Sequence, residues 1–144
     1  MSQHLCEAIV ITCMDWRKHD TDFLREIKKV THFRNCDLVS LAGGAKTLLD
    51  DEDRPVVLKQ IAKSRDLHGI TRVILIAHTD CGAYGGFGTP ERLARDLAEA
   101  KDIVKRRFPS LEVQTFVCRL SPHGESWSVD FITAEQAIND AVAA

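Results

Sequence analysis

Two apolar runs in the chain each end at a residue type that binds soft metal ions. Residues 9–12 are followed by Cys13. Residues 74–77 are followed by His78, with Cys81 three positions later. Such runs are typical of buried strands in a parallel sheet. Two thiolates and an imidazole suit zinc and leave its fourth tetrahedral position free for water or substrate, as in catalytic zinc sites.

The spacing of these three residues has a structural consequence. One loop can hold His78 and Cys81 together, but Cys13 lies far upstream and must be brought close by the fold. A local zinc knuckle is therefore excluded, since its ligands would be neighbours in the sequence.

Each residue also has a simpler interpretation. Cys13 and Cys81, taken singly, fit small buried apolar residues, because free cysteine is commonly buried. A lone histidine at a strand end is often only hydrogen-bonded. The joint placement of the three at the ends of two neighbouring strands favours the zinc site.

Strands and helices are predicted to alternate along the whole chain. We expect strands at about 8–13, 36–41, 71–77 and 111–118, with a short edge strand at 129–132. We expect helices over about 22–30, from the first turn containing Pro55 to about 68, from Thr89 to before Pro109, and from about 133. Residues 16–22 are expected to form a polar turn, and residues 119–126 a loop.

This alternation predicts a single α/β domain over residues 1–144, with a mainly parallel sheet in the order 2-1-3-4, room for an extra edge strand, and helices on both faces. In that order the first and third strands are neighbours, and their connections leave toward opposite faces. Open α/β sheets bind ligands at such a switch point, beyond the carboxyl ends of the strands. Cys13 and His78 lie at those two ends.

Composition restricts the class of partner. The chain has 144 residues, is 44% hydrophobic and 28% charged, and carries a formal net charge of −2. A nearly neutral chain gives no electrostatic reason to expect nucleic acid or an anionic membrane as partner. The N-terminal residues do not form a secretory signal, so we expect a cytoplasmic protein. Five cysteines, an odd number, then indicate free thiols and metal ligands.

Two motifs in this order resemble the zinc site of the β-class carbonic anhydrases: Cys13-x-Asp15-x-Arg17 and, far downstream, His78-x-x-Cys81. The resemblance extends from the first strand to about the fourth. It implies that Zn²⁺ is the cofactor and that the metal ligands are Cys13, His78 and Cys81, with Asp15 as an exchangeable fourth ligand.

The resemblance also implies catalytic roles for Asp15 and Arg17. In the family, the aspartate either binds the zinc in a closed, inactive form or pairs with the arginine while water occupies the metal. Paired with Arg17, Asp15 would stay ionised and accept a proton from that water. A plain surface ion pair is the simpler alternative. Asp80 is expected to cap the turn after His78, without a catalytic role.

Several features depart from the family pattern. Trp16 stands where the family usually has a small residue, and Leu41-Ala42 replaces an Arg-Asn pair before Gly43-Gly44. We also expect most of the N-terminal arm that wraps the partner subunit in the family to be missing. Of the pocket residues that a partner supplies, the expected glutamine has only Gln3 as a nearby counterpart.

The remaining thiols and imidazoles are assigned outside the zinc site. Cys6 and Cys36 lie away from it. Cys118 ends the fourth strand and His123 follows, and packing or a loop role is favoured for both. His19 could shuttle protons if its loop folds over the pocket. The other histidines are expected to be solvated: His4, His32 and His68.

The leading function is the reversible hydration of carbon dioxide to bicarbonate, a zinc lyase reaction, in a homodimer or higher homo-oligomer. Zinc would lower the pKa of its water from about 15.7 toward neutrality. One alternative is hydrolysis of carbonyl sulfide or carbon disulfide at the same site, where Trp16 and Phe87 could form an apolar entrance. The other is a zinc-binding oligomeric or regulatory protein without catalysis, with Asp15 permanently on the metal.

Overall fold

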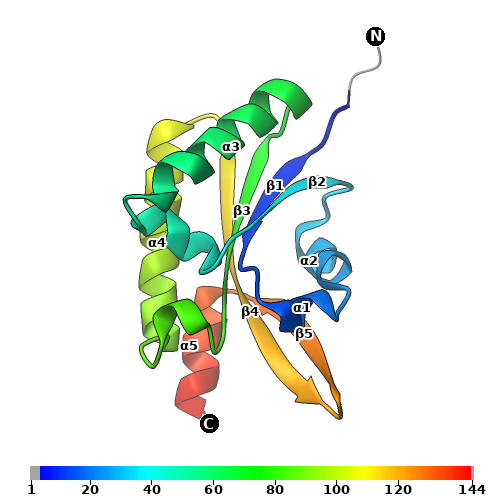
Figure 1. The fold of residues 1–144 in the computed structure, drawn as a ribbon, viewed down its shortest axis with the longest axis vertical. Helices are drawn as coiled ribbons and strands as arrows, with labels where there is room; N and C mark the ends of the chain where they lie inside the picture. Colours follow the sequence, from blue (N-terminus) through cyan, green and yellow to red (C-terminus); the bar gives the residue numbers. More distant parts are fainter. Residues whose placement is uncertain (1–3, 144) are drawn as a thin grey trace.

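A five-stranded sheet in the order β2-β1-β3-β4-β5 forms the centre of the molecule (Figure 1). The computed structural model of the protein describes residues 4–143. All strand pairs are parallel except β4 and β5. The predicted order and the extra edge strand are thus confirmed. The strands are β1 (Ala8–Thr12), β2 (Cys36–Ser40), β3 (Arg72–His78), β4 (Glu112–His123) and β5 (Ser126–Ile132).

Helices cover both faces of the sheet (Figure 1). The α-helices are α1 (Trp16–His19), α2 (Phe23–Thr31), α3 (Asp53–His68), α4 (Pro90–Arg107) and α5 (Ala134–Ala143), and two 3₁₀ turns are η1 (Gly44–Leu49) and η2 (Gly82–Tyr84). α3, α4 and α5 lie on one side of the sheet, and α1 and α2 on the other.

The central strand β1 is buried on both faces. Ile9 and Ile11 pack in the core that includes α3 and α4, whereas Ala8 and Val10 pack in the core that includes α2. Successive side chains of a strand point to opposite faces, so a strand between two helical layers needs apolar residues at every position. This explains the unbroken apolar run.

Most element boundaries follow local chemistry. The Thr89 hydroxyl accepts a hydrogen bond from the Arg92 amide at 3.2 Å, and Pro90 is the first helical residue of α4. α3 ends at Gly69, whose φ of 69° is left-handed. At the start of α4, the threonine hydroxyl accepts a hydrogen bond from a backbone amide that has no partner within the helix, and proline needs no such partner. At the end of α3, glycine adopts the left-handed conformation without strain.

Two sequence predictions are wrong. The expected turn after Asp15 contains the short helix α1, because the Asp15 carboxylate accepts the Arg17 amide and caps it. The expected loop over residues 119–126 is mostly strand: β4 continues to His123 and turns at Gly124 into β5. This hairpin has exposed polar residues, so it lacks the apolar pattern that identifies a buried strand.

No helix within residues 4–143 has both the length and the apolar character required to span a bilayer.

Gly44 packs closely against the backbone at the carboxyl ends of β1 and β3. Its φ is +56°, and a Cβ atom there would lie 2.5 Å from the Ile76 carbonyl oxygen and 2.9 Å from the Cys13 amide nitrogen. Backbone atoms on two strands cannot both move aside. Only glycine therefore lets η1 close over this end of the sheet.

We predict that Gly44→Ala lowers the free energy of unfolding by about 3 kcal/mol or more, because it adds a steric clash to left-handed backbone strain. Gly124→Ala is the matched control: its φ is +63°, but nothing lies within 4 Å of the added Cβ. That change should cost about 1 kcal/mol. Urea denaturation of the metal-free proteins measures both, and equal losses would contradict the packing role of Gly44.

Candidate metal centre

The parallel pairing of β1 with β3 brings the three predicted donors together. Cys13 directly follows β1, His78 is the last residue of β3, and Cys81 lies in the next turn. The sulfur atoms of the two cysteines and a ring nitrogen of His78 all lie within 4.8 Å of one another. All three residues are buried, with exposures of 4% to 6%. The fold therefore forms a compact S, N, S donor cluster.

The backbone around the cluster aims the donors inward. Asp80 adopts a left-handed conformation, with φ of +54°, which turns the chain so that Cys81 returns toward His78. Aspartate tolerates this region better than most residues. On the other side, the Gly43 amide donates a hydrogen bond to the Cys13 sulfur at 3.4 Å. The amide dipole favours a negatively charged sulfur there.

The tautomer of His78 follows from its hydrogen bond. Nδ1 lies 2.7 Å from the Thr79 carbonyl oxygen. A carbonyl can only accept, so Nδ1 carries the proton and Nε2 presents a lone pair. Nε2 is buried and has no hydrogen-bond partner among the described residues. Leaving such an atom unpaired is costly, so its environment favours a cation.

The two thiols are electrostatically coupled. The hydrogen bond from the Cys81 thiol, followed by contacts with His78 and the Gly43 amide, lowers the pKa of Cys13 to about 3, against the opposing effect of burial. The same hydrogen bond, together with burial, raises the pKa of Cys81. Without a cation the two thiols therefore titrate as a pair, with negative charge favoured on Cys13.

The donor set fits zinc. Cys13, Cys81 and Nε2 of His78 would hold the ion through two sulfurs and one nitrogen, and the Thr79 carbonyl already fixes the orientation of the imidazole. A divalent cation would also replace the shared thiol proton and pair with the orphan nitrogen. Three protein ligands of this kind would leave one tetrahedral position for water or substrate.

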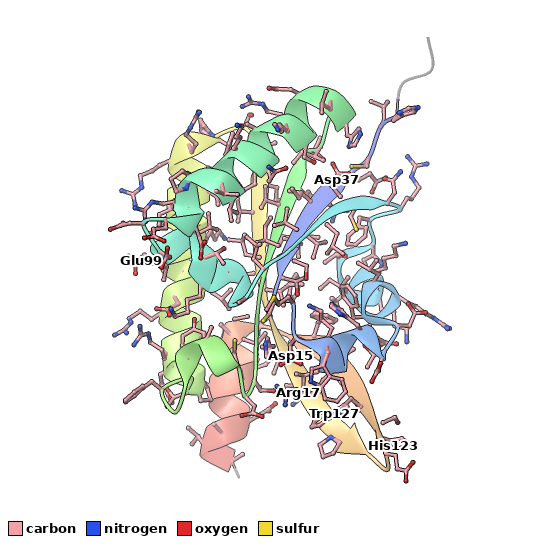
Figure 2. All side chains as sticks on the ribbon, in the orientation of Figure 1. Asp15, Arg17, Asp37, Glu99, His123 and Trp127 are labelled. Atoms are coloured by element: carbon pink, nitrogen blue, oxygen red, sulfur yellow. The ribbon has the colours of Figure 1, made fainter. Side chains whose placement is uncertain are left out.

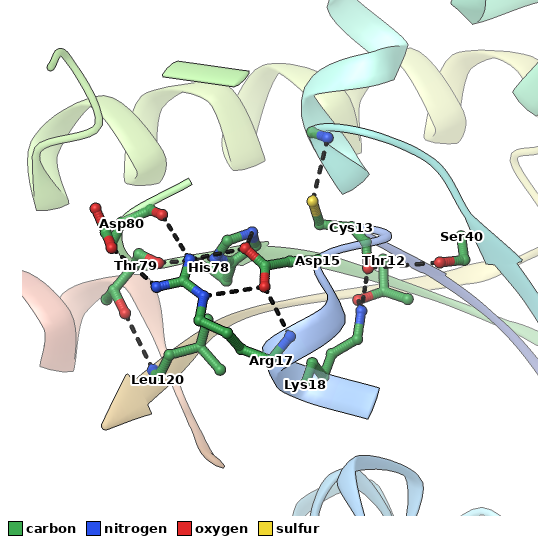
Figure 3. A network of polar contacts seen from close by, with 11 residues as sticks. Thr12, Cys13, Asp15, Arg17, Lys18, Ser40, His78, Thr79, Asp80 and Leu120 are labelled. Carbon is green, nitrogen blue, oxygen red and sulfur yellow. Dashed lines mark hydrogen bonds and ion pairs between the residues drawn. The ribbon is translucent and has the colours of Figure 1, made fainter. Parts of the chain in front are cut away.

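Asp15 pairs with Arg17 beside the cluster (Figure 3). Arg17 Nε donates to Asp15 Oδ1 at 3.0 Å and Nη2 donates to Oδ2 at 2.7 Å, a two-point contact. The side chains are only 16% and 13% exposed. The guanidinium hydrogen bonds lower the pKa of Asp15 to about 2, and the carboxylate raises the pKa of Arg17. Asp15 Oδ2 lies 3.9 Å from His78 Nε2.

Sequence reasoning missed two further partners of Arg17. Asp80 was expected only to cap a turn, but its carboxylate accepts from Nη1 and its carbonyl from Nη2, both at 2.9 Å. The Arg17 guanidinium carbon also lies 5.0 Å from the ring centroid of Trp127 on β5 (Figure 2). The spacing of Arg17 and Asp80 in the sequence gives no sign of this contact, and Trp127 arrives only through the hairpin.

Lys18 is a buried cation beneath the site. It is 2% exposed, and Nζ donates to the Thr12 hydroxyl at 2.8 Å and to the Cys13 carbonyl. Nζ also lies 4.8 Å from the centroid of the Phe23 ring. Burial lowers the pKa of Lys18, while the negative charge of Cys13 opposes that shift. Lys18 thus holds α1 against the end of β1.

Other candidates lie outside the cluster. Cys118 is fully buried in the core on the α2 side of the sheet, and burial raises its pKa to about 12. His123 lies near the tip of the β4–β5 hairpin (Figure 2). His19 is exposed on α1, with its ring 6.2 Å from that of Phe23. Trp16 is 65% exposed. Gln3 lies outside the described residues.

Comparison with known proteins identifies the family. Residues 3–133 match the family described as "Putative carbonic anhydrase". The chain belongs to this carbonic anhydrase family. Proteins of Rickettsia conorii and Rickettsia bellii, both described as uncharacterized, are each 32% identical to it over 127 residues. Those alignments cover 78% of this chain and 67% and 76% of the relatives.

Solved structures share the fold of this family member. The carbonic anhydrase of Streptococcus mutans is 19% identical, with a TM-score of 0.54, and the match covers 83% of this chain and 80% of that one. A carbon disulfide hydrolase in its apo form is 16% identical, with a TM-score of 0.55, over 99% of this chain and 85% of that one. The predicted α/β fold and the family resemblance are confirmed.

We predict that Cys13→Ser, His78→Gln and Cys81→Ser each remove about one zinc ion per chain, because a two-ligand remnant binds zinc weakly. Cys118→Ser is the control, since Cys118 is equally buried but faces the other core. Metal analysis after stripping and reloading measures the content. Unchanged zinc in all three site variants would contradict the assignment.

A second prediction concerns acid stability of the metal-free protein. The pKa of Asp15 is lowered in the folded state, so its contribution to stability is present above the unfolded value of about 3.9 and is lost as the pH falls toward 2. Arg17→Met should remove that contribution, on the order of 1–2 kcal/mol, and flatten the pH dependence of unfolding between pH 5 and 2.

Asp80→Asn is the comparison for this experiment. The Asp80 side chain is 86% exposed, so its pairing with Arg17 is screened by solvent and should change the same profile little. A flat wild-type profile would show that the Asp15–Arg17 pair does not stabilise the fold.

Proposed function

We propose that the protein catalyses the zinc-dependent reversible hydration of carbon dioxide to bicarbonate and a proton. Support comes from membership of the carbonic anhydrase family and from the S, N, S cluster at the switch point of the sheet. The observation that carries the proposal is the unpartnered Nε2 of His78, beside two sulfurs and 3.9 Å from an ionised carboxylate. The proposal includes assembly into at least a dimer.

Zinc held by Cys13, His78 and Cys81 would supply Lewis acidity, making a water molecule nucleophilic near neutral pH. The side chains of the protein would have to meet the remaining requirements of the reaction. The attacking water must be oriented, its proton must be accepted, and carbon dioxide must reach the same position.

Asp15 is suited to orient the attacking water and to accept its proton transiently. Oδ1 is fully engaged, because it accepts both the Arg17 amide and Arg17 Nε. Oδ2 accepts only Nη2 and faces His78 Nε2, so it retains a lone pair toward the reacting water. A carboxyl with a pKa of about 2 cannot retain a proton at neutral pH. It must therefore pass the proton to solvent or buffer.

Arg17 acts as the positioning group for Asp15. Its guanidinium is bound on two sides, by Asp15 and by Asp80, and it lies against the ring of Trp127. These contacts leave the guanidinium little freedom to rotate, so the carboxylate keeps one orientation. They also oppose movement of Asp15 onto the metal, which would break two charge-assisted hydrogen bonds.

Hydrolysis of carbonyl sulfide or carbon disulfide is the second candidate. Met14 and Trp16, on either side of Asp15, are 58% and 65% exposed, and Phe87 is 75% exposed. Apolar residues at an entrance favour small apolar substrates. Zinc-loaded protein that releases sulfide from carbon disulfide faster than it hydrates carbon dioxide would favour this candidate.

We predict that zinc-loaded protein accelerates carbon dioxide hydration over its metal-free form, and that Asp15→Asn lowers kcat/KM by about 10²-fold or more while zinc remains bound. An amide cannot accept the proton. Stopped-flow assays with a pH indicator measure the rates, and His123→Gln is the control because His123 is exposed near the tip of the β4–β5 hairpin. Loaded protein with no rate above the metal-free form would refute the proposed activity.

The outcome for Asp15→Asn also tests the non-catalytic alternative. If Asp15 were a permanent zinc ligand, the asparagine variant would lose zinc or gain affinity for azide. If Asp15 stays paired with Arg17, the zinc content and the azide affinity of the Asp15→Asn variant should stay close to those of the wild type, while its rate of carbon dioxide hydration falls.

A further inference from the structure

A second cluster of metal-binding side chains lies at the opposite end of the sheet. The Cys6 sulfur, a carboxylate oxygen of Asp37 and a ring nitrogen of His68 all lie within 4.8 Å of one another. Figure 2 shows Asp37 at the other end of the sheet from Asp15 and Arg17. Cys6 was expected to lie away from the zinc site and His68 to be solvated, and neither takes part in the proposed hydration chemistry.

Three separate elements build the cluster. Asp37 is the second residue of β2 and pairs with Ile9, so its side chain points to the face covered by α3. His68 is the last residue of α3. Cys6 precedes β1, and its amide donates to the His68 carbonyl at 2.9 Å, which holds the N-terminal segment beside the helix end. The grouping is therefore fixed by main-chain contacts.

The hydrogen bonds already order two of the donors. Asp37 Oδ2 accepts from the Ser64 hydroxyl at 2.5 Å and lies 2.7 Å from His68 Nδ1. Ser64 and His68 are four residues apart on α3 and share one face of the helix. An Asp–His–Ser network alone would explain these contacts as packing of α3 on β2. The Cys6 thiol, which donates to the Ala8 carbonyl at 3.5 Å, lies within reach of both polar groups and adds a soft donor that this packing does not require.

A small tetrahedral ion would need only a modest rearrangement of the donors. With Zn–N and Zn–O near 2.0 Å and Zn–S near 2.3 Å, tetrahedral ligands lie about 3.3 to 3.6 Å apart. The Asp37–His68 separation of 2.7 Å would have to open by about 0.6 Å, which a side-chain rotation supplies because both side chains are partly exposed, at 30% and 34%. A cation would replace the proton between them.

An entry path exists beside the cluster. A pocket of about 280 Å³ is lined by Asp37, Ser64 and His68, with Gln60 and Lys63 also on its wall. It opens to solvent over β2 and α3, so an ion can reach the Asp37 and His68 donors, while Cys6 lines a separate pocket of about 240 Å³.

We propose that Cys6, Asp37 and His68 form a second site for a divalent cation of zinc type, which links the segment before β1 to β2 and α3. Thiolate, carboxylate and imidazole together suit zinc better than magnesium or calcium, which prefer oxygen ligands alone. The two anionic donors offset the charge of the ion. This site is independent of the proposed hydration activity.

Zinc content tests the second site directly. Metal-stripped wild-type protein, dialysed against micromolar zinc, should bind two ions per chain, and Cys6→Ser and His68→Gln should each bind one. Cys36→Ser is the matched control, because Cys36 lies on the same strand as Asp37 but packs in the other core. It should still bind two. Circular dichroism melting confirms that each variant is folded.

The double variant Cys13→Ser/Cys81→Ser separates the two sites. It should retain one zinc ion per chain, and adding Cys6→Ser should remove it. With cobalt in place of zinc, the thiolate charge-transfer band of the double variant should reflect one sulfur ligand. Failure of the first site would appear as unchanged zinc content in this variant, whereas failure of the second would appear as no zinc at all.

A measurement on the wild-type chain needs no substitution. Zinc should slow alkylation of Cys6 by iodoacetamide at least tenfold, while Cys36 is unaffected, as read by mass spectrometry of the peptides. Equal zinc content in wild type and Cys6→Ser, together with no protection of Cys6, would overturn the proposal.

Discussion

The pairing of β1 with β3 is the constraint on which the site depends. The two strands are distant in sequence, yet their parallel register places the residue after β1 and the last residue of β3 at the same edge. Gly44 closes that edge at a distance that admits no side chain. A shift of either strand by one residue would turn its side chains to the other face. Because β1 is apolar on both faces, the packing of particular side chains and the close approach of Gly44 to the backbone of β3 and of Cys13 fix the register and, through it, the donor cluster.

Positively charged side chains balance the negative charge of the candidate metal centre. Negative charge is favoured at Cys13 and Asp15, and Lys18 and Arg17, whose side chains are both largely buried, lie on either side of it. Burying a lysine without a carboxylate partner is costly. Here the Thr12 hydroxyl and the Cys13 carbonyl accept from it, and the nearby thiolate opposes the loss of its proton. The protein scaffold thus provides the positive charge that keeps this cluster stable before any metal is considered.

The sequence was sufficient for the strand order and for the residues at the switch point, because both follow from apolar runs that end at chemically distinctive side chains. It was insufficient where contacts depend on tertiary structure. Asp80 and Trp127 reach Arg17 only because a left-handed turn and a hairpin bring them there. Lys18 was assigned to a polar turn, since lysine in a short polar stretch normally indicates solvent exposure. Cys6, Asp37 and His68 come from three elements and have no common spacing.

The donor clusters at the two ends of the sheet differ in their burial and in the charged groups beside them. At the carboxyl end, the three donors are almost fully buried, and an ionised carboxylate held by arginine stands beside them. Such a rigid, charged environment would restrict a water molecule to few orientations, as catalysis requires. At the other end, Asp37 and His68 are about one-third exposed, and the nearby side chains act only on each other. Within residues 4–143, the carboxylate of this second cluster is paired with a histidine and a serine, and no arginine holds it as Arg17 holds Asp15. Donor type alone therefore predicts metal binding at both ends, and the second layer of charged residues distinguishes a site that can react from one that can only stabilise the fold.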